Sequence, residues 1–426
     1  MLTATILSFV VILLAGMPIV FALGLAATIG LVVDGTLPLT IIPQRMTGMI
    51  DTFALLAVPF FVLAGELMER GGISKRLVEM VSAFIGHFRG GLAMVCVVSS
   101  MIFAGITASS AADAAAIGAI LIPAMIRQGY SAPFCASVQA ASATMGPIIP
   151  PSTLAIIYAA LTGVSIGSLF LAGMVPGLLM GLSLLFLARY YAIRMVEATS
   201  EPADFRTRLA SLRSAVWALF VPVIILGGIL SGIFTATESG AMAVVYALLV
   251  GLFVYKELKL SDLPDIFVRS TMITGMVMIV LSAAGIFAWI LVTQNLPRIA
   301  ADFLMAITQN AGIVMLLIIV FMLFIGMVME IVAAGIIMIP VLAPIGMAMG
   351  FNEVHFGMVI MMTMALGAVT PPVGVTLFVA MGIAGARLSE VNRYIWPMVF
   401  VLAAVVLLVA FVPEVALFVP RLFGWL

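Results

Sequence analysis

Apolar stretches long enough to cross a membrane alternate with short polar segments along the whole chain. A hydrocarbon layer of about 30 Å is crossed by a helix of about 20 apolar residues. The pattern therefore predicts an all-α polytopic membrane protein. One long polar segment, 194–213, is expected to be a loop that separates a first repeat, 1–193, from a second repeat, 214–426.

Each repeat is predicted to contain the same series of elements. In the first we expect scaffold helices within 1–68, an interfacial helix over 70–88, a hairpin over 90–127, a broken helix over 131–161 and a helix over 164–193. In the second we expect scaffold helices within 214–293, an interfacial helix over 295–310, a hairpin over 311–350, a broken helix over 353–382 and a last helix over 394–420.

The duplication is indicated by one motif that occurs twice. A polar tip of small residues at 105–113 is followed by a Gly-x-x-x-Pro-Pro break at 146–153, and the second copy lies 221 positions later without a gap. The matching pairs are Gly105 and Gly326, Pro123 and Pro344, Gly129 and Gly350, Gly146 and Gly367, Pro150 and Pro371, and Pro151 and Pro372. A run of Gly and Pro anchors in fixed register indicates internal repeats.

Both breaks interrupt a helix inside sequence that belongs in the membrane. Two prolines remove two backbone donors, and each freed carbonyl costs several kcal/mol in hydrocarbon unless a polar group meets it. Unwound backbone is therefore expected where it is buried in protein or lines a wet cavity. Paired broken helices are typical of the midplane substrate and ion site of a secondary transporter. A proline kink that serves packing alone is the alternative.

The apolar legs around the first tip suggest a re-entrant hairpin. Arg89 and Arg127 stand at its two feet, whereas Asp113 is the one charged residue near the tip. Such a segment enters and leaves the membrane on the same face, and two ordinary spanning helices are the alternative. The N-terminal stretch 1–33 lacks the basic start and small-residue cleavage site of a signal peptide, so we expect retained membrane segments.

Basic residues in short loops predict the orientation in the membrane. The basic loops at 189–213 and 256–259 lie one span pair apart, so both are expected on the cytoplasmic face. Counting outward puts the feet of the first hairpin inside and those of the second, Asn310 and Asn352, outside. The two repeats are thus expected to be inverted, with both termini periplasmic, in a bacterial inner membrane.

Composition supports the membrane class and argues against others. The chain has 65% hydrophobic and 8% charged residues, and 18 Lys plus Arg balance 18 Asp plus Glu, so charge indicates no nucleic-acid partner. The only cysteines, Cys96 and Cys135, lie in apolar stretches, and there are two histidines, so neither a disulfide framework nor a metal cluster is expected. No Gly-rich phosphate loop with a lysine is present, so we expect no ATP hydrolysis by the chain.

The polar groups of the first tip and break suit a partly dehydrated Na+ ion. Thr107, Ser109 and Ser110 supply hydroxyls, and the segment 146–150 supplies freed carbonyls. Unwound carbonyls and helix C-termini attract a cation, whereas helix N-termini attract a substrate carboxylate. The alternative for each hydroxyl is a hydrogen bond to the backbone of its own helix.

Asp113 is the most informative single residue, because ionisable groups within apolar legs are costly and usually functional. Three roles are open to it: it could bind the cation, carry a proton, or cap the second leg of the hairpin. In the second copy the polar members are Glu330, Thr363 and Thr370.

One short motif points to a different chemistry. The segment 163–167, Gly-Val-Ser-Ile-Gly, matches the nucleophile-elbow pattern around Ser165. That pattern needs a preceding strand and a histidine base, and neither is evident, so we expect a loop. An intramembrane hydrolase and a passive channel are kept as alternatives to a transporter.

Five motifs of the chain carry a resemblance to a known family. They are Ser109-Ser110-Ala111-Ala112-Asp113, Ile122-Pro123 with Gly129-Tyr130, Gly146-x-x-x-Pro150-Pro151-Ser152, Phe234-Thr235-Ala236-Thr237-Glu238 and Thr370-Pro371-Pro372-Val373-Gly374. Together they resemble the large membrane subunit of tripartite ATP-independent periplasmic (TRAP) transporters, within the ion-transporter superfamily. The resemblance covers essentially the whole chain.

This resemblance implies an elevator-type transporter, in which hairpins and broken helices form a mobile part against a scaffold. It implies Na+-coupled uptake of a carboxylate of C4-dicarboxylate or sialic-acid type. The partners would be a periplasmic substrate-binding protein and a small four-helix membrane subunit. An H+-coupled organic-anion carrier that acts without a binding protein is the alternative.

Candidate site residues follow from the motifs and the resemblance together. The expected Na+ ligands are Ser109, Ser110, Asp113, Gly146, Pro150, Gly367 and Thr370. The expected substrate contacts are Thr107, Ser109, Ser152, Thr153, Glu330 and Thr363. We expect no catalytic residue, and no cofactor other than the coupling ion.

Overall fold

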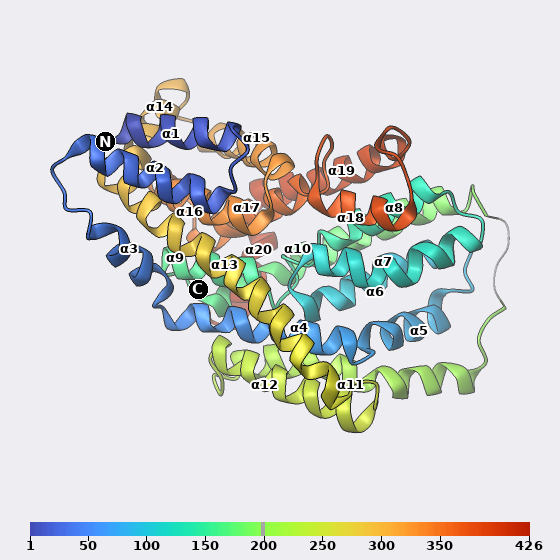
Figure 1. Ribbon diagram of the computed structural model, residues 1–426. Helices are drawn as coiled ribbons and strands as arrows, with labels where there is room; N and C mark the ends of the chain where they lie inside the picture. Colours follow the sequence, from blue (N-terminus) through green and yellow to red (C-terminus); the bar gives the residue numbers. More distant parts are fainter. Residues whose placement is uncertain (197–200) are drawn as a thin grey trace.

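The computed structural model describes residues 1–196 and 201–426, and within these ranges the chain is built of helices without a strand (Figure 1). Eight helices of the described part are long and apolar enough to cross a membrane, and a bent pair of shorter helices adds a ninth span if it is counted as one. The chain is therefore an all-α polytopic membrane protein, as predicted.

The helices follow one another closely in both parts of the chain. The first part contains α1 (Leu2–Leu14), α2 (Ile19–Asp34), α3 (Ile41–Ile50), α4 (Ala57–Arg70), α5 (Ile73–Ile85), α6 (Gly91–Thr107), α7 (Ser110–Arg127), α8 (Ala132–Ala143), α9 (Thr153–Thr162) and α10 (Ile166–Ala192). The second contains α11 (Phe205–Leu230), α12 (Ala236–Leu249), α13 (Leu263–Thr293), α14 (Leu296–Ile307), α15 (Ala311–Val328), α16 (Ile331–Ala348), α17 (Glu353–Gly367), α18 (Val375–Ala384), α19 (Leu388–Phe411) and α20 (Glu414–Leu422).

The helix α11 begins at Phe205, inside the segment 194–213 that the polar pattern predicts to be a loop. The Asp204 side chain caps this helix by accepting a hydrogen bond from the Thr207 N–H at 3.0 Å. An N-cap of this kind stabilises the first turn of a helix, so polar residues continue α11 beyond its apolar span. The predicted loop is therefore wrong over 205–213, and residues 197–200 lie outside the described part.

The predicted last helix, 394–420, is two helices. The first of them, α19, begins at Leu388 and ends at Phe411, and α20 starts at Glu414 after a short break. Pro413 in that break has no N–H to donate, so it cannot continue the hydrogen-bond ladder of α19.

Each predicted hairpin is a pair of helices joined by two residues. Ala108 and Ser109 join α6 to α7, and Met329 and Glu330 join α15 to α16. The helices α7 and α16 begin and end at equivalent positions, 221 residues apart. The tips thus lie where the pattern places them. The re-entrant insertion and the inverted orientation of the repeats stay predictions.

The two broken helices exchange their second halves across the molecule. The break at 144–152 separates α8 from α9, and the break at 368–374 separates α17 from α18. The half-helix α9 packs against α16, whereas α18 packs against α7 and α8 (Figure 1). Both hairpins and both broken helices therefore form one packed body.

A second set of helices forms a wall beside this body. The helix α13, which crosses the molecule diagonally in Figure 1, packs against α2, α3 and α4, and α4 packs against α12. α13 also contacts α16 of the second hairpin. α4 and α13 thus bring the wall up to the hairpins.

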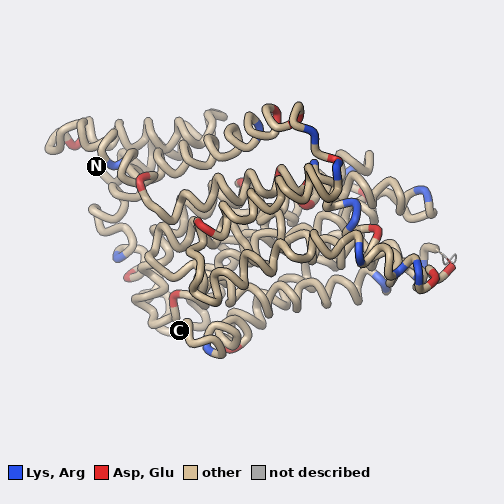
Figure 2. Tube along the Cα trace, turned by 90° about the horizontal axis from the view of Figure 1, so that it is seen from below, with Lys and Arg blue, Asp and Glu red and all other residues tan. Residues whose placement is uncertain are grey.

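Charged residues are unevenly distributed along the molecule. Figure 2 shows Lys and Arg gathered mainly at the end that lies away from both termini, whereas Asp and Glu occur at both ends. The two ends of the helical body therefore differ in their content of basic residues.

Candidate functional site

A cavity of about 610 Å³ lies between the two tips and the wall formed by α4 and α13. Its volume falls in the range of about 300–1,000 Å³ that is usual for small-molecule sites. The predicted site residues that line it are Ser109, Ser110, Thr153 and Glu330. The opposite wall contributes the charged residues Glu66, Glu69, Arg70 and Arg269.

Ser109 forms the N-cap of α7 at the first tip. Its Oγ accepts a hydrogen bond from the Ala112 N–H at 3.4 Å. The proposed cap by Asp113 is therefore wrong, since Ser109 occupies that position. Thr107 at the end of α6 donates to the Phe103 carbonyl at 3.4 Å and lies outside the cavity lining.

The first break lies directly against the first tip. A methyl group added to Gly146 would lie 2.9 Å from the carbonyl carbon of Ser109 and 3.0 Å from the nitrogen of Ser110. Only a residue without a side chain allows two backbones to approach this closely. The unwound segment of the break and the tip thus share one location.

A residue that the sequence analysis did not select completes the tip. The Thr376 hydroxyl donates to Ser110 Oγ at 3.2 Å, and both side chains are buried. Thr376 lies at the start of α18, 266 positions after Ser110. Its place just after the second Pro-Pro pair is the sequence signal that could have identified it.

Asp113 is fully buried and lies outside the cavity lining, with its carboxylate bonded to α6 and its backbone carbonyl to α8. Its Oδ1 accepts a hydrogen bond from Ser100 Oγ at 3.0 Å. Gln139 Nε2 donates to the same hydroxyl at 3.3 Å and to the Asp113 backbone carbonyl at 3.2 Å. In turn, Gln139 Oε1 accepts from the Cys96 thiol at 2.9 Å.

The second carboxylate oxygen of Asp113 has no hydrogen-bond partner among the described residues. Ser142 Oγ is likewise buried and unpartnered in that part of the chain. On α8, Ser142 lies between Gln139, which contacts Asp113, and Gly146, which contacts the tip. A buried carboxylate with a single donor is stabilised by a cation or by a proton, and we refer to Asp113 with Ser100, Gln139 and Ser142 as the Asp113 layer.

The residues that follow the first break have different surroundings. Ser152 is the N-cap of α9, donates to the Pro147 carbonyl at 2.6 Å and lies outside the cavity lining. Thr153, the next residue, lines the cavity. The Pro150 carbonyl faces α6, since it lies 3.5 Å from a methyl group placed on Gly105.

The second tip is capped by a carboxylate where the first has a hydroxyl. Glu330 Oε2 accepts a hydrogen bond from the Ala333 N–H at 3.0 Å at the start of α16. The second break approaches its hairpin at Gly367, where an added methyl group would lie 2.6 Å from Gly326 Cα. In the second repeat, the break thus contacts α15 at Gly326, four residues before Glu330. In the first repeat, Gly146 contacts the tip residues Ser109 and Ser110.

Two predicted residues of the second copy bond to their own helix. Thr363 donates to the Val359 carbonyl at 2.7 Å, and Thr370 donates to the Leu366 carbonyl at 2.6 Å. Both side chains are buried, and neither lines the cavity. Each hydroxyl thus donates to the backbone of its own helix, which is the alternative to a role in binding for Ser and Thr in membrane helices.

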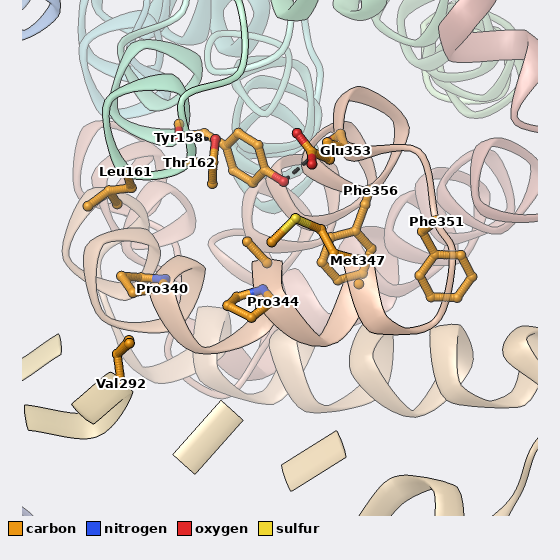
Figure 3. Close-up of a pocket in the computed structure, with 12 residues that line it drawn as sticks. Tyr158, Leu161, Thr162, Val292, Pro340, Pro344, Met347, Phe351, Glu353 and Phe356 are labelled. Carbon is orange, nitrogen blue, oxygen red and sulfur yellow. Dashed lines mark hydrogen bonds between the residues drawn. The ribbon is translucent and has the colours of Figure 1, made fainter. Parts of the chain in front are cut away.

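A smaller cavity of about 210 Å³ lies between α9, α16 and α17 (Figure 3). Figure 3 shows the Tyr158 hydroxyl directed toward Glu353, whose backbone carbonyl accepts its hydrogen bond at 3.1 Å. Most of the lining is apolar, with Pro340, Pro344 and Met347 along one side. None of the predicted site residues lines this cavity, so the candidate site is the larger one.

A helical membrane body in which two tips and two interrupted helices meet is the architecture of a secondary transporter. A similar fold occurs in the YdaH transporter of Alcanivorax borkumensis, with a TM-score of 0.66 over 91% of this chain and 88% of that chain. The two sequences are 15% identical, so this likeness concerns the fold alone.

The family model of the tripartite ATP-independent periplasmic transporter, DctM component, matches residues 6–415, and the chain belongs to this family. Over 375 residues it is 39% identical to a C4-dicarboxylate TRAP transporter large permease protein of Pseudomonas aeruginosa, covering 88% of each chain. Over 411 residues it is 38% identical to an isethionate TRAP transporter permease protein of Oleidesulfovibrio alaskensis, covering 96% of this chain and 65% of that relative. The resemblance seen in the motifs is confirmed, and the chain is a transporter permease rather than an enzyme.

Proposed function

We propose that the chain is the large membrane subunit of an importer that takes up a small organic acid together with Na+. The main support is the cavity of about 610 Å³, which is lined by both tips and by Pro147 of the first break. The buried Asp113 layer lies beside the first tip. An ion held in that layer lies next to a substrate held in the cavity. Binding of one can therefore favour binding of the other.

The cation is placed at the first hairpin. Asp113 Oδ2 supplies the negative charge and Ser142 Oγ a neutral oxygen, and neither has a protein partner in the described chain. Ser110 lies one turn before Asp113 on α7, and Gly146 of the break lies against the backbone of Ser109 and Ser110. Hard oxygen donors with one carboxylate match the preference of Na+ and exclude softer metals.

The substrate is placed between the tips. The helix α7 begins at the cavity with a neutral cap, Ser109, and the positive end of its dipole favours an anion there, whereas the start of α16 is capped by the Glu330 carboxylate. The names of the relatives mention a C4-dicarboxylate and isethionate. We therefore assign an organic acid, with C4-dicarboxylate or sialic-acid type as the class.

For the transport movement we infer an elevator, in which the packed body of hairpins and broken helices slides against the wall of α4 and α13. The end rich in Lys and Arg in Figure 2 is assigned to the cytoplasm by the positive-inside rule, which leaves both termini periplasmic. A small membrane subunit and a periplasmic binding protein complete the transporter.

An H+-coupled carrier is the second candidate, and the burial of Asp113 favours it. A fully buried carboxylate that accepts one hydrogen bond is also neutralised by a proton. Na+ and H+ coupling then differ in which gradient drives uptake.

The test is uptake of radiolabelled succinate and isethionate into proteoliposomes that contain the chain with its small subunit, with binding protein added outside. We expect uptake that needs an inward Na+ gradient, persists when a protonophore collapses the proton gradient, and stops when either partner is omitted. Uptake that continues without Na+ and stops with the protonophore would transfer the assignment to H+. Transport by the isolated chain would contradict the proposed partners.

Replacing Ser110 by alanine is expected to raise the Na+ concentration for half-maximal uptake roughly ten- to a hundredfold, because an oxygen beside the ion and the acceptor of Thr376 are both lost. Ser109→Ala is expected to act in the same direction. Na+ titration of uptake measures both effects.

The control for these serine variants is Ser165→Ala. Ser165 is the N-cap of α10, as Ser109 is of α7, so its replacement also removes a cap but lies away from the cavity. Wild-type Na+ dependence in Ser109→Ala and Ser110→Ala, with activity lost in Ser165→Ala, would place the ion elsewhere.

A further inference from the structure

Two arginines line the main cavity on the side opposite the tips. Arg70 is the last residue of α4, and Arg269 lies in the second turn of α13. Arg70 is half-buried and Arg269 is exposed, so both charges are accessible to a solute that enters the cavity. Neither residue belongs to the five motifs of the chain.

Neither guanidinium is paired with a carboxylate of the described chain. The four ion pairs found there involve the N-terminus, Arg76, Arg298 and Arg421. Arg76, for example, contacts Glu257 at 2.7 Å and lies over the Tyr255 ring at 3.9 Å from its centroid. Arg70 and Arg269 have no such contact, so their N–H donors remain available to an occupant of the cavity.

Two carboxylates on α4 accompany the arginines. Glu66 and Glu69 line the same wall, and Glu69 lies within electrostatic range of Glu66, Arg70 and Arg269. None of the ion pairs within 4.0 Å joins these groups. The carboxylates thus balance the arginines at a distance without occupying their hydrogen-bonding positions.

We propose that Arg70 and Arg269 form an anion subsite on the α4–α13 wall, which takes the carboxylate or sulfonate group of the transported acid. This inference rests on the proposed function and names the groups that recognise its substrate. A guanidinium presents a planar fork of donors that matches two oxygens of such an anion. The first tip offers hydroxyls and the N-terminus of α7 from across the cavity, so an acid would be held between this helix end and the arginines.

The two arginines make the subsite selective for charge. An acid with anionic groups at both ends engages one arginine with one group and the N-terminus of α7 at the first tip with the other. A monoanion such as isethionate can bind either the arginines or the tip side of the cavity, but not both. A dicarboxylate such as succinate is therefore expected to depend more strongly on the arginines than isethionate does.

The experiment measures equilibrium binding of radiolabelled succinate and isethionate to the purified complex of this chain with its small subunit, in Na+-containing buffer. Arg269→Gln and Arg70→Gln are expected to weaken succinate binding roughly ten- to a hundredfold each. Arg269→Lys, which keeps the charge but loses the fork, is expected to recover part of the affinity. Glu69→Gln is expected to tighten succinate binding, because it removes a negative charge from the wall that carries the arginines.

Arg298→Gln is the matched control, since Arg298 lies in α14 with 83% of its side chain exposed and outside the cavity. Succinate binding within twofold of wild type in both arginine-to-glutamine variants overturns the subsite. Equal weakening in Glu69→Gln also overturns it, because the effect would then come from general damage to the cavity. A wild-type complex that binds and transports neither these two acids nor sialic acid overturns the proposed function itself.

Discussion

Replacing Gly146 by alanine is expected to reduce Na+-driven uptake to background. The added methyl would lie 2.9 Å from the Ser109 carbonyl carbon, and this neighbour is backbone, which cannot rotate away. Overpacking of this kind costs about 1–3 kcal/mol and moves the tip from the break. Na+-dependent uptake in proteoliposomes, together with the amount of assembled complex, measures the effect.

The matched control for Gly146→Ala is Gly382→Ala. Gly382 lies in the second half of the other broken helix, where an added methyl group meets nothing within 4 Å. Its substitution should leave uptake near wild type. If Gly146→Ala transports normally, the tip and the break do not share a binding site.

Asp113→Asn is expected to abolish Na+-driven uptake at physiological Na+ concentrations while leaving the complex assembled. The amide retains an oxygen that can accept from Ser100, so the hydrogen-bond network around Gln139 keeps its shape. The negative charge that we assign to the cation is lost, which should raise the half-maximal Na+ concentration roughly a hundredfold or more. Uptake is measured over a Na+ titration and, separately, with an imposed proton gradient.

Asp302→Asn serves as the control for Asp113→Asn, since it neutralises an exposed aspartate that pairs with Arg298 on α14. It should show the wild-type titration. Asp113→Asn with unchanged Na+ dependence would contradict the placement of the ion. A variant that loses only uptake driven by protons would assign the carboxylate to H+ transfer.

The positions of both tips and both breaks could be predicted from the sequence because Gly and Pro carry local backbone information. Ala108-Ser109 and Met329-Glu330 are the two-residue joints that the 221-residue register indicates. The start of α11 was missed because its first turns are polar, and their helical state depends on the Asp204 cap rather than on hydrophobic pattern. The break before α20 was not predicted, although Pro413 in the sequence is the residue that ends the hydrogen-bond ladder of α19 there.

The site could be predicted only in part, because a motif shows which residues are unusual but not which way they face. Ser109 and Ser110 lie at the cavity, whereas Asp113, one turn further, contacts α6 and α8 instead. The contact between Ser110 and Thr376 depends on packing between the two halves. Arg269 belongs to no motif, and only the packing of α13 shows that it lines the cavity.

The exchange of half-helices has a consequence for how the chain is made. The first tip emerges from the ribosome with Ser110 but receives its cover, α18 with Thr376, only after a further 266 positions have been synthesised. Until α18 is synthesised, the surfaces of α7 and α8 that pack against it are exposed to lipid or to an insertion factor. The first tip is therefore completed late, and a truncated chain that lacks α18 would carry all of the first motif and still have an incomplete tip.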